Sequence, residues 1–325
     1  MRPFLLIAAS SSFLLLSSAA PAQTSSVRPV ALVTAETANE VLAVSLGSHG
    51  GRVLRRVHLV DPLMIAAAAH GPAVVVDPSG TVTLLAWHSL RPIRVFHSFR
   101  APKVAEIAPN GRLAYVTDEH TGDLTVIDLA QLRIVGRVFV GLSAHHFGIS
   151  PDGRRIWVAL GESARTIVRL DAANPRRPRV IGRFHPSFGA HDVVFARDDR
   201  TVLVTSPTAS TLSAYSAAGR VPRLLWSAGG GRGPEHVAAA GDSAFVASGY
   251  GSSLDAFSLG SPSRAPLHAA APYGSFNLAT YRGYVVTTSL FTGQVSEFRA
   301  GDLHRLWTTK VAPAARYVAI SVWPR

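Results

Sequence analysis

Alternating apolar and polar residues form paired runs along most of the chain, and each pair is joined by a short polar turn. AYVTDEHTGDLTVIDL, starting at Ala114, and VLVTSPTASTLSAYS, starting at Val202, both show this pattern. Alternation with a period of two places successive side chains on opposite faces of a strand, so each pair predicts a β-hairpin. No stretch shows the sustained 3.6-residue periodicity that an amphipathic helix requires.

The hairpins recur at a nearly fixed period. A further short apolar run precedes most hairpins, and another follows most of them. Four strands in a repeat of about 42 residues are typical of a β-propeller blade. We therefore predict an all-β, seven-bladed propeller with four-stranded blades, in a single domain over residues 23–325. The equivalent valines, spaced by 41, 42, 42, 46, 42 and 40 residues, are Val33, Val74, Val116, Val158, Val204, Val246 and Val286.

The two ends of the chain predict how the ring closes. The segment RPVALVTAE, from Arg28, aligns with the second strand of the repeat, so the first blade lacks its first strand. The segment ARYVAISVWPR, from Ala315, aligns with a first strand but no hairpin follows it. We predict that this C-terminal strand joins the N-terminal blade, which leaves no open sheet edge at the seam.

The fourth strand of each repeat should be outermost, and these strands are rich in arginine. One interpretation is edge protection, because charge on an exposed edge strand blocks pairing with another chain. The other is a basic girdle for an anionic cell-surface polymer. We favour edge protection because the charges are distributed over the blades rather than gathered on one face. The residues are Arg55, Arg56, Arg91, Arg94, Arg133, Arg137, Arg183 and Arg223.

The first 22 residues have the pattern of a secretory signal peptide. Arg2 is followed by an apolar stretch from Phe4 to about Leu16, and small residues then end in Ala20-Pro21-Ala22. The apolar stretch is shorter than the roughly 20 residues that a spanning helix needs. We expect cleavage after Ala22 and an exported protein, periplasmic or extracellular, with no membrane span.

Composition narrows the chemistry. The chain has no cysteine, which excludes thiolate nucleophiles, zinc–thiolate sites and iron–sulfur clusters. The formal net charge is +12, yet no basic cluster is interleaved with aromatic residues, so we do not expect nucleic-acid binding. We expect a monomer whose partner is an unidentified protein, polymer or small-molecule ligand at the channel mouth.

Candidate chemistry gathers where the first strands begin. The first strand of a propeller blade is innermost, and the residues just before it lie at the mouth of the central channel. Alignment of the first strands places Lys103, Phe276 and Arg316 in one part of this mouth. Three consecutive repeats bring titratable residues to another sector, namely His145, His146, His191, Asp192, Glu235 and His236.

Three interpretations of this cluster remain open. The histidines can be structural, because a neutral imidazole offers one donor and one acceptor. They can bind a divalent metal such as zinc, and no other cofactor is expected. They can also form a general acid–base site in which a carboxylate tunes a histidine. The candidate metal ligands are His145, His146, His191, Asp192 and His236.

Two segments resemble known propeller repeats. ISPDGRRIWVAL, from Ile149, and IAPNGRLAYVTDEHTGDLTVIDL, from Ile107, resemble the YVTN-type seven-bladed propeller repeat, which implies the same fold. RGPEHVAAAG, from Arg232, is similar to the GPRHVAFSPDG segment of propeller lactonases related to 6-phosphogluconolactonase, although Glu235 replaces the arginine of that segment.

The second resemblance implies an acid–base site at the channel mouth. Glu235 and His236 match by position, and the full set of candidate catalytic residues is His191, Glu235, His236 and Arg316. The loss of the arginine removes the expected anion clamp. We therefore favour a non-enzymatic binding scaffold, with a lactonase-like or lyase-like enzyme as the alternative.

Overall fold

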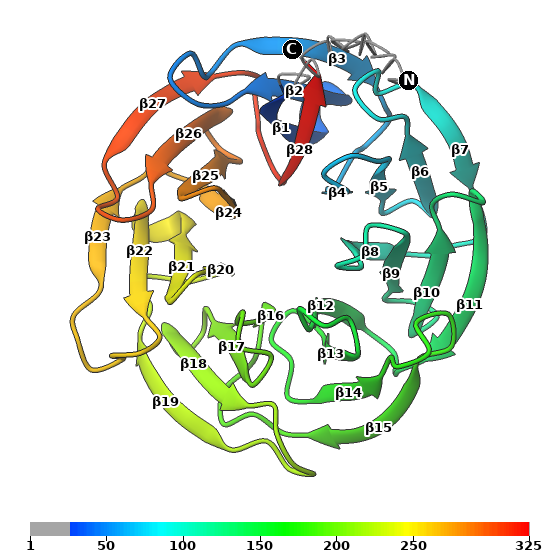
Figure 1. Cartoon of the computed structure of the whole chain (residues 1–325), viewed down its shortest axis with the longest axis vertical. Helices are drawn as coiled ribbons and strands as arrows, with labels where there is room; N and C mark the ends of the chain where they lie inside the picture. Colours follow the sequence, from blue (N-terminus) through cyan, green and yellow to red (C-terminus); the bar gives the residue numbers. More distant parts are fainter. Residues whose placement is uncertain (1–26, 325) are drawn as a thin grey trace, which may run out of the picture.

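The computed structural model describes residues 27–324, so the predicted signal peptide, residues 1–22, lies outside the described part. Seven four-stranded antiparallel sheets are arranged as blades around a central axis (Figure 1). The prediction of an all-β, seven-bladed propeller is confirmed. Within residues 27–324 the helical segments are two short 3-10 turns, η1 (Glu36–Ala38) and η2 (Gly249–Gly251). No helix in this range is long and apolar enough to cross a membrane.

The blades follow one another along the chain, and the four strands of each blade are ordered from the central channel outward. Blade 1 contains β28 (Val318–Pro324), β1 (Val27–Ala35), β2 (Glu40–Ser45) and β3 (Val53–His58). Blade 2 contains β4 (Met64–Ala67), β5 (Ala73–Asp77), β6 (Thr81–Leu85) and β7 (Pro92–Phe96). Blade 3 contains β8 (Pro102–Ile107), β9 (Leu113–Asp118), β10 (Asp123–Asp128) and β11 (Arg133–Phe139). Blade 4 contains β12 (Ala144–Ile149), β13 (Arg155–Leu160), β14 (Ile167–Asp171) and β15 (Arg179–Phe184).

The remaining three blades repeat the same order. Blade 5 contains β16 (Val193–Phe195), β17 (Thr201–Ser206), β18 (Thr211–Ser216) and β19 (Leu224–Gly229). Blade 6 contains β20 (His236–Ala240), β21 (Ser243–Ser248), β22 (Ser253–Ser258) and β23 (Leu267–Ala270). Blade 7 contains β24 (Ser275–Tyr281), β25 (Tyr284–Ser289), β26 (Gln294–Arg299) and β27 (Arg305–Lys310).

The C-terminal strand closes the ring as predicted. β28 pairs antiparallel with β1, from Val27 opposite Pro324 to Val33 opposite Val318. Figure 1 shows β28 as the inner strand of the blade formed by β1, β2 and β3. Blade 1 thus joins the two ends of the described chain, and its innermost strand has the same place as those of the other blades.

The hydrophobic core lies between neighbouring blades. Every residue of β9 is buried, whereas every residue of the outer strand β11 is at least partly exposed. A strand that is covered on both faces needs an apolar residue at nearly every position, which explains why the second strands read as continuous Val-rich runs. One core cluster runs from Met64 in blade 2 through Val116 in blade 3 to Val158 in blade 4. Each blade is therefore stabilised by its two neighbours.

Threonines at the ends of second strands tie each blade to the next. Thr34 donates to the carbonyl of Leu63 at 3.1 Å, and Thr117 donates to the carbonyl of His145 at 2.9 Å. Thr205 donates to the carbonyl of Glu235 and Thr288 to that of Arg316. Each bond crosses from one blade to the mouth residue of the following blade, so it fixes where that residue lies.

Several outer-strand arginines also connect blades. Arg56 of blade 1 donates to the carbonyl of Val311 at 3.0 Å, after blade 7. Arg137 of blade 3 reaches Ser98 after blade 2, and Arg183 of blade 4 donates to the carbonyl of Val140 at 2.7 Å, after blade 3. These three arginines each bond to the preceding blade, a role that neither interpretation of the arginine-rich edge included.

Candidate metal centre at the channel mouth

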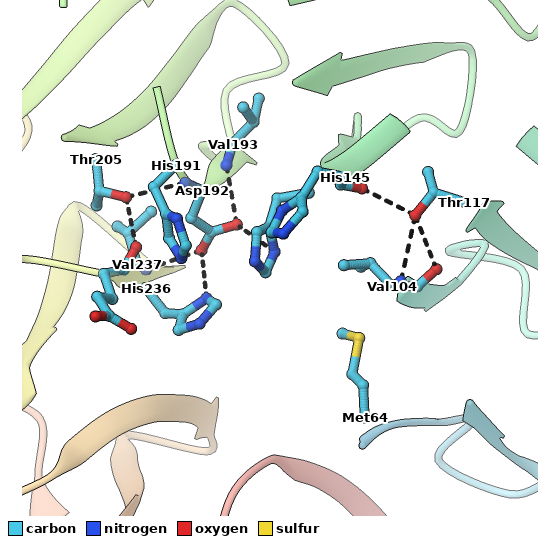
Figure 2. A network of polar contacts seen from close by, with 12 residues as sticks. Met64, Val104, Thr117, His145, His191, Asp192, Val193, Thr205, His236 and Val237 are labelled. Carbon is cyan, nitrogen blue, oxygen red and sulfur yellow. Dashed lines mark hydrogen bonds and ion pairs between the residues drawn. The ribbon is translucent and has the colours of Figure 1, made fainter. Parts of the chain in front are cut away.

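The antiparallel order of the blades determines which residues reach the mouth. Because the first and second strands run in opposite directions, the start of the first strand and the end of the second lie on the same side of the ring. His145 and His146 are in β12, His191 and Asp192 directly precede β16, and His236 begins β20. The predicted convergence of three consecutive blades is therefore present in the structure (Figure 2).

A β-bulge sets the position of the His145–His146 pair. Ala144 faces Leu160 on β13, but Phe147 faces Val158, so two residues of β12 lie opposite one residue of β13. A bulge interrupts the strict alternation of side chains and redirects one of them. The His145 and His146 rings consequently contact each other, with their centroids 4.4 Å apart, and both side chains are buried.

Three of the buried histidines form a compact group. His146, His191 and His236 each offer a ring nitrogen, and these nitrogens lie within 4.8 Å of one another. The ring centroid of His146 lies 4.7 Å from those of both His191 and His236, and the latter two are 5.3 Å apart. We call these residues the three-histidine centre.

The spacing of the rings suits a tetrahedral metal. Zinc binds imidazole nitrogen at about 2.0–2.1 Å, which puts three tetrahedral nitrogens roughly 3.3 Å apart and their ring centroids about 5 Å apart. The observed centroid distances of 4.7, 4.7 and 5.3 Å agree with this value.

An oxygen atom lies near Nδ1 of each of the three rings. Nδ1 of His191 lies 2.8 Å from the carbonyl oxygen of Glu162. Nδ1 of His146 lies 3.8 Å from one carboxylate oxygen of Asp192, and Nδ1 of His236 lies 3.5 Å from the other. The hydrogen bond from Nδ1 of His191 to the carbonyl of Glu162 places the proton on Nδ1 and leaves the Nε2 lone pair of His191 for a metal. Asp192 lies where it can orient two ligands rather than serve as one.

Asp192 is itself held firmly. Backbone N–H groups of Val193 and Val237 donate to its two carboxylate oxygens at 2.9 and 3.0 Å (Figure 2). Burial acts to raise the pKa of Asp192, but the hydrogen bond and charge of His236 and the backbone donor of Val237 outweigh it and keep the pKa below its usual value. Asp192 therefore carries a negative charge beside the three-histidine centre at neutral pH.

Burial keeps the imidazoles of His146 and His191 neutral. It lowers the pKa of His191 to about 4, and the positive charge of a protonated His236 would add to the effect. Burial also lowers the pKa of His146 well below the usual value, followed by the charges of His236 and His145. Since a metal competes with a proton for the same lone pair, neutral rings at physiological pH are ready to bind a metal.

His145 has a different place. It is not part of the three-histidine centre, although its ring packs against those of His146 and His191. Its Nε2 is 3.5 Å from Glu119, and neither ring nitrogen has a hydrogen-bond partner. Burial lowers the pKa of His145 to about 2, so the ring is an uncharged packing element beside the centre.

Two cavities meet at the histidines. The outer cavity, about 240 Å³, opens at the mouth and is bordered by all three rings of the centre; we call it the vestibule. The inner cavity, about 350 Å³, lies along the channel and is bordered by His146, Asp192 and His236. Tyr317, whose hydroxyl is 3.5 Å from Nε2 of His236, borders both cavities.

A carboxyl group lines the inner cavity. Burial raises the pKa of Glu106, on β8, to about 8, and the negative charge of Asp192 adds to this effect. At neutral pH the native protein therefore holds Glu106 mainly in its protonated, uncharged form. A single negative charge, that of Asp192, then remains next to the histidines on this side.

The remaining candidate residues also border the vestibule. Burial raises the pKa of Glu235, the charge of His236 opposes that shift, and the side chain lies beside the three-histidine centre. Arg316 reaches the vestibule too, but its guanidinium lies 2.7 Å from the carboxylate of Glu36. The structure thus brings His191, Glu235, His236 and Arg316 to one cavity, with the arginine already paired.

Sequence reasoning missed the residues at the ends of second strands. Glu119, Glu162, Tyr250 and Phe291 follow the second strands of blades 3, 4, 6 and 7, and all but Glu119 border the vestibule. The signal was present, because an antiparallel hairpin places the turn after a second strand on the same face as the start of the first. Aligning those turns as well as the first strands would have found them.

Comparison with known proteins supports the fold. No protein-family profile matches the chain. Over 141 residues it is 33% identical to the dihydro-heme d1 dehydrogenase of Pseudomonas aeruginosa, a match that covers 39% of this chain and 27% of that relative. The matched part is thus only about a quarter of the relative's length.

Solved propeller structures superpose over most of the chain. A functionally unknown protein from Desulfotomaculum acetoxidans has a TM-score of 0.76 at 14% identity, covering 90% of this chain and 98% of its own. A candidate 6-phosphogluconolactonase from Bacteroides fragilis has 0.75 at 13%, covering 93% and 99%. Hydrazine synthase from Kuenenia stuttgartiensis has 0.71 at 16%, covering 83% and 92%. At these identities the likeness concerns the fold alone.

Proposed function

We propose that this protein is an exported propeller that binds one divalent transition metal ion, such as zinc, at the three-histidine centre. The observation that carries the proposal is the group of buried ring nitrogens of His146, His191 and His236, which lie within 4.8 Å of one another. Three imidazoles with an open further position are typical of metal sites that also bind a ligand or water.

The oxygen atoms around the three rings support the same assignment. Asp192 lies near Nδ1 of His146 and of His236, and the carbonyl of Glu162 lies 2.8 Å from Nδ1 of His191. Such outer contacts orient ligands and strengthen metal binding. The imidazole ligands would not neutralise the two positive charges of a divalent ion, and Asp192 would compensate them only in part. The site is therefore suited to one additional anionic ligand.

The alternative function is lactone hydrolysis. It is favoured by Glu235, which borders the same vestibule as the histidines, and one of the structurally similar proteins is a candidate 6-phosphogluconolactonase. In that reaction a water oxygen attacks the acyl carbon, the ring C–O bond breaks, and the proton passes to the leaving oxygen. A bound metal would supply the positive charge that Arg316, paired with Glu36, does not offer freely.

Export and family are part of this proposal. The pattern of residues 1–22 supports export, and the ISPDG and YVTD segments support a place among YVTN-type propellers. The expected mature N-terminus is Gln23. Mass spectrometry of the protein recovered from the periplasm or medium measures it, and a chain that retains residues 1–22 would contradict export by this route.

The metal assignment is tested by equilibrating the purified protein with zinc, removing free ion and measuring bound metal. We expect one zinc per chain, and loss of at least 90% of it in His146→Ala and His236→Ala. His97→Ala is the matched control, because His97 is an exposed histidine just beyond the outer strand β7. Equal zinc content in all four proteins would contradict the three-histidine centre.

The same preparations separate binding from catalysis. If the protein is a lactonase, Glu235→Gln and His236→Ala should each reduce turnover of simple lactones about a hundredfold or more. If it is a binding protein, it should bind zinc, and the zinc-loaded form should turn over no lactone of the panel. Turnover that is equal in all variants would show that the activity comes from elsewhere.

A further inference from the structure

One side of the vestibule is a wall of aromatic rings. Tyr250, from η2, Phe291, from the turn after β25, and Phe276, on β24, pack against one another in a triangle, and we call these three residues the aromatic wall. Their ring centroids are 4.9 Å apart for Tyr250–Phe276 and 5.4 Å apart for Phe276–Phe291. Tyr250 is 50% exposed and Phe291 is 47% exposed, so the wall presents a large apolar face to solvent.

The backbone is built to hold these rings. A side chain at Gly249 would meet the Phe276 ring at 2.2 Å, and one at Gly274 would meet the Phe291 ring at 2.6 Å. Gly274 also has a φ of +83°, which favours glycine. Phe276 and Phe291 therefore pack directly on the backbone of two glycines, where a larger residue would displace them. Large apolar faces that are fixed in this way are typical of binding sites.

The other sides of the vestibule are polar. The three-histidine centre borders it, and Lys103 and Glu162 border it from blades 3 and 4. Lys103 lies 3.7 Å from Glu119, so its charge is largely compensated. A ligand in this cavity would therefore have one flat apolar side toward the aromatic wall and a polar group toward the histidines.

The volume limits the size of the ligand. Cavities for drug-sized molecules are about 300–1,000 Å³, and the vestibule is smaller, about 240 Å³. One six-membered ring with a small polar substituent fits such a space, whereas a fused or macrocyclic ring system would have to extend out of it. A divalent ion at the three-histidine centre would favour a ligand with an anionic oxygen donor.

We propose that the vestibule binds a small one-ring aromatic anion, with its ring against the aromatic wall and its anionic oxygen donor at the metal. This proposal rests on the metal-binding function above. It adds the chemical class of the ligand and assigns specificity to Tyr250, Phe276 and Phe291. The aromatic wall recognises the ring through edge and face contacts, and the metal recognises the anionic oxygen donor.

The test uses a pair of probes that share one chelating group. Benzohydroxamate and acetohydroxamate both bind a metal through two oxygens, but only the first has an aromatic ring. Each is titrated by calorimetry into the zinc-loaded protein, the zinc-loaded Phe291→Ala variant and the zinc-loaded Phe139→Ala variant. Phe139 is the matched control, because it is a phenylalanine that is 59% exposed at the end of the outer strand β11.

We expect the native protein to bind benzohydroxamate about five to ten times more tightly than acetohydroxamate, as ring–ring contacts provide. Phe291→Ala should reduce this ratio about threefold or more by weakening benzohydroxamate alone, and Phe139→Ala should leave it unchanged. Zinc content is measured in every sample after the titration. A ratio that is the same in native protein and Phe291→Ala, or no binding of either probe, with zinc present, would overturn the ligand assignment and leave the metal site intact. Absence of zinc from the native protein would overturn both.

Discussion

Replacing Glu106 with glutamine should make the protein more stable at pH 7.5 and leave its stability nearly unchanged near pH 4.5. Burial raises the pKa of Glu106 to about 8 in the native protein, against 4.5 in an unfolded chain. Between these values the unfolded chain releases a proton that the native protein keeps, so rising pH favours unfolding. Glutamine has nearly the same size and no proton to lose, and therefore removes this penalty.

The size of the effect follows from the same values. Each pH unit between 4.5 and 8 costs about 1.4 kcal/mol, which gives about 4 kcal/mol at pH 7.5 and less than about 1 kcal/mol at pH 5.0. Glu106 borders the inner cavity, and water there reduces the penalty, so we expect the gain from Glu106→Gln to grow by about 2–3 kcal/mol between pH 5.0 and 7.5.

Urea unfolding followed by tryptophan fluorescence measures this difference, with a chelator present so that no metal contributes. Glu40→Gln is the matched control, because Glu40 forms a surface ion pair with Arg56 at 2.7 Å, and such pairs contribute at most about 1 kcal/mol. Its effect should not grow between the two pH values. If the gain from Glu106→Gln is the same at pH 5.0 and 7.5, the carboxyl group is not held uncharged in the channel.

Two further predictions concern acid stability and ring closure. Burial lowers the pKa of His191 to about 4 from 6.5, so its contribution to stability is complete above pH 6.5 and is lost as pH falls toward 4. The free energy of unfolding of the metal-free protein should therefore fall by about 3 kcal/mol between pH 6.5 and 4 because of this residue, and His191→Gln should not show this part of the fall. If the free energy of unfolding falls equally with pH in both proteins, the assignment is contradicted. Deletion of residues 315–325 removes β28 and exposes the edge of β1, so the melting temperature should fall by more than about 10 °C, as expected when several kcal/mol are lost. A melting temperature within a degree or two of the full chain would show that β28 does not stabilise the ring.

Most of the fold could be predicted from the sequence because a propeller repeats one simple pattern. Each hairpin alternates with a period of two, and seven copies must share the same geometry for the ring to close. The C-terminal strand could be placed because the first repeat lacks a strand and the last segment, from Ala315, supplies one. The strands that the alternating pattern predicts are therefore the strands that the closed ring requires.

The site could be predicted only in part. Alignment of first strands brings the histidines to one sector, but it does not give the direction of a side chain within a bulge. His145 and His146 are neighbours in sequence, yet only His146 joins the three-histidine centre. The orienting role of Asp192 also depends on distances to two Nδ1 atoms, which no spacing in the sequence encodes.

The aromatic wall was missed for a similar reason. Phe276 aligns with the first strands, but Tyr250 and Phe291 follow second strands, where turn residues vary from blade to blade. The residue type at this turn changes from glutamate in blade 4 to phenylalanine in blade 7, so only the position after the second strand, and not the residue type, identifies it. Such residues become informative only when the topology puts them beside the same cavity.

X-ray absorption spectroscopy at the zinc edge of the zinc-loaded protein tests the central claim most directly, because it reports the ligands of the bound ion itself. We predict three imidazole nitrogens at about 2.0–2.1 Å, with the multiple scattering of histidine rings, and an additional light atom from water or an added anion. A shell of oxygen ligands without imidazole scattering, or a single imidazole per zinc, would contradict a centre formed by His146, His191 and His236.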